Sequence, residues 1–76
     1  MDKLIAILTD VCPEVDFVNG TDLVTNGVID SMDVVAMIGE ISDAFDVEVP
    51  VEEIKPENFD SAKAIFELIE KLQRHA

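Results

Sequence analysis

GVIDSMD, at residues 27–33, ends a glycine-led turn and opens an amphipathic helix. Apolar residues then recur at the helical period, which predicts a helix over residues 31–45 with one buried face. That face consists of Val34, Met37, Ile38, Ile41 and Phe45. Ser31 lies off this stripe. An isolated serine at a helix start is interpreted as an N-cap, whose hydroxyl oxygen accepts a hydrogen bond from a free backbone N–H.

Two more helices and one helical turn are predicted on either side of this segment. The first helix spans residues 2–11 and ends before Pro13, because proline disfavours helical geometry in the preceding residue. A short helical turn is predicted at residues 52–54, and the last helix follows a cap at Asp60 or Ser61. The apolar stripes of the first and last helices consist of Leu4, Ile5, Leu8 and Val11, and of Ile65, Leu68, Ile69 and Leu72.

The fold class follows from these elements. Val47, Val49 and Val51 alternate with polar residues as in a strand, but no second strand is available to pair with them. The sequence therefore predicts an all-α fold: a small bundle of three main helices plus one short helix, with a long loop between helices 1 and 2. With 76 residues and no internal boundary, residues 1–76 are expected to form a single domain and a monomer.

The connection over residues 13–30 is long for so small a chain. It contains the turn signals Asn19-Gly20 and Asn26-Gly27 and no clean periodicity. A loop of this length is expected to be functional or held by its own side chains. The candidates for holding it are Phe17, Leu23, Val28 and Ile29.

The chain carries no recognisable targeting segment. It begins Met1-Asp2-Lys3, without the basic leader and apolar run of a secretory signal, and its apolar runs are too short to cross a membrane. We therefore expect a cytoplasmic protein without a membrane span.

Acidic residues dominate the charge. The chain has 17 acids, 5 Lys and Arg, and a net charge of −12. Residues 10–60 hold fourteen of the acids and a single base, Lys55. This balance excludes nucleic acid as a partner and favours partners with basic surfaces. The same charge would also serve as a solubilising surface.

The sequence lacks the parts of an active site. Its one histidine, His75, is next to the C-terminus, and no base accompanies Ser31 to activate it as a nucleophile. The single Cys12 can form no internal disulfide and is interpreted as a small packing residue. We therefore predict no catalytic residues and no enzyme activity.

A calcium site is the alternative that the acidic residues suggest. An EF-hand loop starting at Asp22 would place Asn26, Asp30 and Asp33 at ligand positions. Its third position, however, is Val24, which has no side-chain oxygen, and its twelfth is an aspartate instead of the usual bidentate glutamate. We therefore predict no metal site.

A third interpretation treats Ser31 as an acceptor of phosphate, because free N–H groups at a helix start favour a phosphate ester there. Here the sequence resembles the acyl and peptidyl carrier proteins, which carry 4′-phosphopantetheine on the serine of an Asp-Ser-Leu or Asp-Ser-Met motif. The matching residues are Asp30-Ser31-Met32. The resemblance extends over essentially the whole chain, through Asp22-Leu23, Gly27, the apolar stripe of residues 34–45, Phe45-Asp46-Val47-Glu48-Val49-Pro50, Ile54 and Phe59-Asp60-Ser61.

The resemblance implies a carrier and not an enzyme. A phosphopantetheinyl transferase would attach 4′-phosphopantetheine from coenzyme A to Ser31, between Asp30 and Met32, in a magnesium-dependent step. The terminal thiol of the arm would hold an acyl or aminoacyl group as a thioester and present it to loading and acyl-transfer enzymes. The residues expected to dock these partners are Asp33, Val35, Ala36, Gly39 and Asp43.

The resemblance leaves the cargo open among fatty-acid or lipid, polyketide, nonribosomal-peptide and D-alanyl pathways. Ala36 and Gly39 stand where fatty-acid carriers usually have glutamate or methionine, and Ile29 replaces a small residue before the motif. All three differ from the fatty-acid type, and Ile29 at this position resembles D-alanyl carriers and some stand-alone peptidyl carriers. The alternative function is an acidic helical binding module, with or without calcium, in which Ser31 is only an N-cap.

Overall fold

The structure, a computed structural model, describes residues 2–74. Within them it contains the α-helices α1 (Asp2–Val11), α2 (Ser31–Phe45), α3 (Pro56–Phe59) and α4 (Ala62–Arg74), the 3₁₀ turn η1 (Val51–Glu53), and no strand. The all-α prediction is confirmed, including its three main helices and the long loop between the first two.

The short helix α3 is the element that the sequence analysis did not predict. Pro56 occupies its first turn, where the N–H that proline lacks would have no partner inside the helix. The predicted turn at residues 52–54 is present as η1, one residue earlier than expected. Pro56 therefore starts a helix in this chain.

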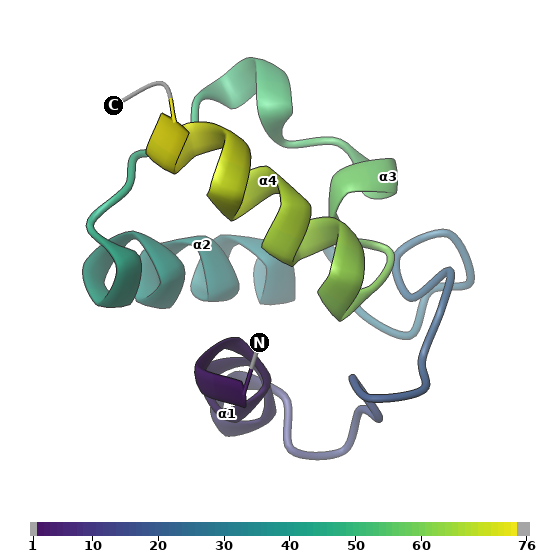
Figure 1. Cartoon of the computed structure of the whole chain (residues 1–76). Helices are drawn as coiled ribbons and strands as arrows, with labels where there is room; N and C mark the ends of the chain where they lie inside the picture. The colour runs from purple at the N-terminus through teal and green to yellow at the C-terminus, as the bar shows by residue number, and fades with distance from the viewer. Residues whose placement is uncertain (1, 75–76) are drawn as a thin grey trace.

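The three main helices pack around one apolar core. Helix α1 contacts both α2 and α4, and α3 contacts α4. Figure 1 shows α1 nearly end-on below α2, with α4 crossing above α2. The buried core residues on these elements are Leu4 and Leu8, Val34, Met37 and Ile41, Phe59, and Ala62, Ile65, Leu68 and Ile69. Burial of each large apolar side chain contributes about 1.5–3 kcal/mol relative to exposure.

The predicted stripes account for most of this core. Partly buried members at its edges are Ile5, Val11, Ile38, Phe45 and Leu72. Cys12 is also buried, at the end of α1, which confirms its interpretation as a packing residue.

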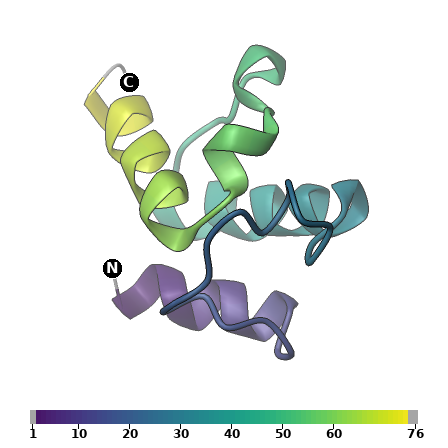
Figure 2. The same cartoon turned by 90° about the vertical axis from the view of Figure 1, so that its right-hand side faces the viewer.

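The loop over residues 13–30 is held by its own side chains, as predicted, with one correction. Phe17, Leu23 and Ile29 are buried, whereas Val28 is 52% exposed. The backbone N–H groups of Val28 and Ile29 both donate to the Leu23 carbonyl, at 2.8 and 3.1 Å, and only the Ile29 side chain enters the core. Figure 2 shows this loop rising from the end of α1 across one side of the molecule.

Asp60 connects the middle of this loop to the start of α4 by hydrogen bonds. The Asp60 carboxylate accepts hydrogen bonds from the N–H groups of Val24 and Thr25 and from the Thr25 hydroxyl, at 2.9, 2.9 and 2.8 Å. The Asp60 carbonyl accepts another from the Leu23 N–H. The cap of the last helix is therefore Ser61, whose hydroxyl accepts from the Ala64 N–H at 3.1 Å.

Candidate functional site

The start of α2 is organised by two aspartates. Asp30 is the N-cap, and its carboxylate accepts a hydrogen bond from the Asp33 N–H at 2.9 Å. The Asp33 carboxylate in turn accepts from the Asp30 N–H at 3.3 Å, which completes a capping box. The interpretation of Ser31 as an N-cap is therefore wrong, because the residue before it has that role.

This register leaves the hydroxyl of Ser31 available. Ser31 is the first residue of α2 and is exposed, as are its neighbours Asp30 and Met32. The side-chain hydrogen bonds that the structure shows at this helix start join Asp30 to Asp33. Ser31 thus presents its oxygen to solvent at a helix N-terminus, where free N–H groups and the helix dipole favour a negative group.

A cavity of about 190 Å³ lies next to Ser31. Besides the serine, it is lined by Val24, Val34, Val35, Ile54, Lys55, Pro56 and Phe59. The cavity therefore lies between the first turns of α2 and the segment that links η1 to α3. Its walls are mainly apolar. Ile54 is 41% exposed and nearby Val51 is 82% exposed, so apolar surface continues past α2. Neither residue is among the docking residues expected from the sequence, because all of those lie on the helix over residues 31–45.

The predicted docking residues lie along α2. Val35 is 64% exposed, and Ala36, Gly39 and Asp43 are exposed as well. Asp33 is half-buried and belongs to the capping box. A Cβ atom added to Gly39 would meet nothing within 4 Å, so no close contact within the described chain requires a glycine there.

The calcium alternative gains no support from the arrangement of its residues. Asp33 is engaged in the capping box, and the backbone N–H of Val24 points to the Asp60 carboxylate. Among residues 2–74, no group of three or more His, Cys, Asp or Glu side chains is placed to hold a metal ion. His75 lies outside the described residues.

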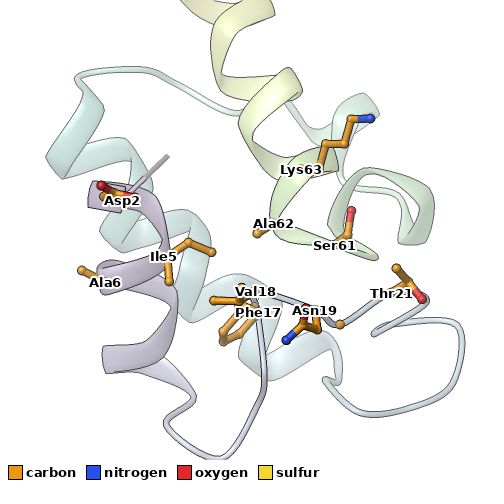
Figure 3. A pocket seen from close by; sticks show the side chains of 11 residues that line it. Asp2, Ile5, Ala6, Phe17, Val18, Asn19, Thr21, Ser61, Ala62 and Lys63 are labelled. Atoms are coloured by element: carbon orange, nitrogen blue, oxygen red, sulfur yellow. The ribbon is translucent and has the colours of Figure 1, made fainter.

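A second cavity, of about 550 Å³, lies between α1, the loop and the start of α4. Figure 3 shows Ile5 and Ala6 of α1, Phe17 and Val18 of the loop, and Lys63 of α4 around it. Ser31 is not part of its lining, so the two cavities are separate features of the surface. Within residues 2–74, no helix is long and apolar enough to span a membrane.

The chain matches the family described as "Phosphopantetheine attachment site" over residues 2–69. It is 32% identical over 73 residues to a D-alanyl carrier protein of Lactobacillus delbrueckii subsp. bulgaricus, covering 93% of this chain and 90% of that protein. It is 40% identical over 52 residues to a D-alanyl carrier protein of Streptococcus equi subsp. zooepidemicus, covering 68% of this chain and 66% of that protein. The chain thus belongs to the phosphopantetheine attachment family, as a helical carrier of covalent 4′-phosphopantetheine similar to D-alanyl carrier proteins.

Proposed function

We propose that Ser31 is the attachment residue and that the cargo is D-alanine, held as a thioester on the terminal thiol of the arm. The observation that carries the attachment site is the register of α2: Asp30 caps the helix, and the exposed Ser31 hydroxyl is left for another enzyme to modify. The cargo is inferred from the similarity to these relatives, which are D-alanyl carrier proteins.

The attachment step needs little from the carrier itself. The Ser31 oxygen attacks the phosphorus that bears the pantetheine group in coenzyme A, and the pyrophosphate bond to the nucleotide breaks. Adenosine 3′,5′-bisphosphate leaves, and the serine proton passes to a base on the transferase. The new phosphodiester would lie at the first turn of α2, where the positive end of the helix dipole favours a negative group. We propose that this chain supplies the acceptor and no catalytic group.

The partners are a phosphopantetheinyl transferase, a D-alanine-loading enzyme and the enzyme that receives the D-alanyl group. We propose that they dock with basic surfaces on the exposed face of α2, at Met32, Val35, Ala36, Gly39 and Asp43, next to Asp30 and Asp33. Two observations support this docking surface. Met32, Val35, Ala36, Gly39 and Asp43 are all exposed, and the net charge of −12 favours basic partners. We further propose a single-domain monomer that acts in the cytoplasm, where coenzyme A is available.

The attachment site is tested by incubating the protein with coenzyme A, Mg²⁺ and a broad-specificity transferase, followed by intact-mass measurement. The wild type and Ser42→Ala, a matched change on the same helix, should each gain one phosphopantetheine group. Ser31→Ala should gain none. A wild type that gains no mass, or a Ser31→Ala variant that gains it equally, would refute the assignment.

The cargo is tested separately on the modified protein. Incubation with ATP, a D-alanine-activating enzyme and either D-alanine or L-alanine should add mass only with D-alanine, and hydroxylamine should remove it because a thioester is cleaved. Modification of Ser31 without D-alanine loading would retain the carrier and reject this cargo.

A further inference from the structure

One cationic residue, Lys55, lines the same cavity as Ser31. The cavity of about 190 Å³ is bounded by the start of α2 on one side and by Ile54, Lys55 and Pro56 on the other. Figure 1 shows α3 on the same side of the molecule as the start of α2, and residues of both elements line this cavity. Of the residues between 2 and 74 that line this cavity, Lys55 alone has a positive charge.

The charges around the cavity make this cation significant. Lys55 is the only base in residues 10–60, a range that holds fourteen acids. A phosphodiester on Ser31 would place another negative charge directly beside the carboxylates of Asp30 and Asp33. The phosphodiester and these carboxylates would repel one another, and a nearby ammonium group offsets that repulsion. The positive end of the α2 dipole also stabilises a phosphodiester on Ser31, but it already interacts with the Asp30 carboxylate.

Lys55 has only weak partners elsewhere. The pKa of Glu53 is lowered mainly by its hydrogen bond from Lys71, at 2.9 Å, and the charge of Lys55 adds only a smaller effect. The Lys55 ammonium group lies 4.0 Å from a carboxylate oxygen of Glu57, and the two side chains are 48% and 74% exposed. An exposed ion pair at this distance contributes little, so the long lysine side chain can exchange it for a better partner at small cost.

We propose that the Lys55 ammonium group pairs with the phosphodiester of 4′-phosphopantetheine on Ser31 and directs the first bonds of the arm along this cavity. Lys55 is a positioning residue in this scheme, because it orients the arm and takes no part in the thioester chemistry. The inference rests on the proposed attachment at Ser31.

The test compares unmodified and modified forms of the wild type, Lys55→Gln, Lys55→Arg and Lys63→Gln. Lys63→Gln is the matched control, because it also removes one exposed positive charge but lies at the other cavity. At low salt, the Tm of the modified form minus that of the unmodified form should be about 1–4 °C lower in Lys55→Gln than in the wild type. Lys55→Arg and Lys63→Gln should match the wild type, and high salt should abolish the difference.

A second readout reports on the phosphate directly. The ³¹P resonance of the modified protein should shift in Lys55→Gln and stay unchanged in Lys63→Gln. If either the Tm difference or the ³¹P resonance fails to separate these two variants, the proposal is wrong. A chain that gains no phosphopantetheine would instead refute the attachment site and this inference together, whereas a modified chain with indistinguishable variants refutes the inference alone.

Discussion

At the residue scale, the site depends on which of two adjacent residues caps α2. Aspartate and serine are nearly equal as N-caps, so Asp30-Ser31 could begin the helix at either position. In the structure Asp30 caps and Asp33 returns the second hydrogen bond. The hydroxyl of Ser31 is consequently not engaged in the capping box. A helix that began one residue later would use the Ser31 hydroxyl as its cap, whereas the observed helix start leaves that hydroxyl accessible.

Replacing the cap should destabilise the fold measurably. We expect Asp30→Ala to lower the free energy of unfolding by about 1 kcal/mol, because the Asp33 N–H loses its acceptor, while Asp30→Ser should lose much less. Urea denaturation followed by far-UV circular dichroism measures both. An alanine variant as stable as the serine variant would show that the capping box contributes nothing.

At the scale of the element, α2 carries a glycine that its own fold does not need. Gly39 lies in the middle of the helix on an exposed position, with open space where a Cβ would be. Glycine there costs about 1 kcal/mol relative to alanine. Since packing within the described chain gives no reason for it, close approach of a partner to this face is the explanation that agrees with the proposed docking surface.

This explanation predicts opposite effects on stability and on loading. Gly39→Ala should raise the free energy of unfolding by about 0.5–1 kcal/mol and, if a partner approaches here, should slow D-alanyl loading. Ala36→Gly, the reverse change on the same exposed face, should lower stability by a similar amount. A Gly39→Ala variant that is more stable and loads normally would exclude close approach at this residue.

The connection between the loop and α4 should respond to acid. The hydrogen bond from the Thr25 N–H lowers the pKa of Asp60, with smaller contributions from the Thr25 hydroxyl and the Val24 N–H. A carboxylate with a lowered pKa stabilises the fold above its unfolded pKa, about 4, and this contribution disappears as the pH falls through the folded value. Asp60→Asn should therefore lower the Tm at pH 7, with a difference from the wild type that shrinks below pH 4.

Thermal unfolding from pH 7 to pH 2.5 measures this difference. Because Asp16 and Glu53 also have lowered pKa values, both proteins should lose stability in acid, and only the gap between their Tm values reports on Asp60. A gap that stays constant over this range would show that ionisation of Asp60 does not stabilise the loop.

At the scale of the whole molecule, helical periodicity predicted most of the fold. The stripes of α1, α2 and α4 supply most of the core. Three features escaped it for separate reasons. The four residues of α3 are too few to show a helical period. Periodicity also does not fix a helix start to within one residue, so it could not decide between Asp30 and Ser31 as the cap. The hydrogen bonds of Asp60 reach residues 35 and 36 positions away, which no local pattern reveals.

The net charge of −12 should make the stability of the whole chain depend on salt. Added salt screens repulsion among the acidic residues, so the Tm should rise between low and moderate ionic strength. Differential scanning calorimetry in sodium chloride and in choline chloride at equal ionic strength should give similar increases, as expected for screening. A Tm that does not change would show that repulsion is a minor term.

The burial of Cys12 has a consequence for the fidelity of acyl transfer. Burial, followed by the charge of nearby Asp33, raises the pKa of this thiol, and the thiolate is the form that attacks thioesters. Cys12 is also the only cysteine of the chain. A cargo held on the arm therefore meets only a weakly nucleophilic thiol on its own carrier. The same packing that completes the end of α1 thus protects the cargo from transfer to a side chain that could not pass it on.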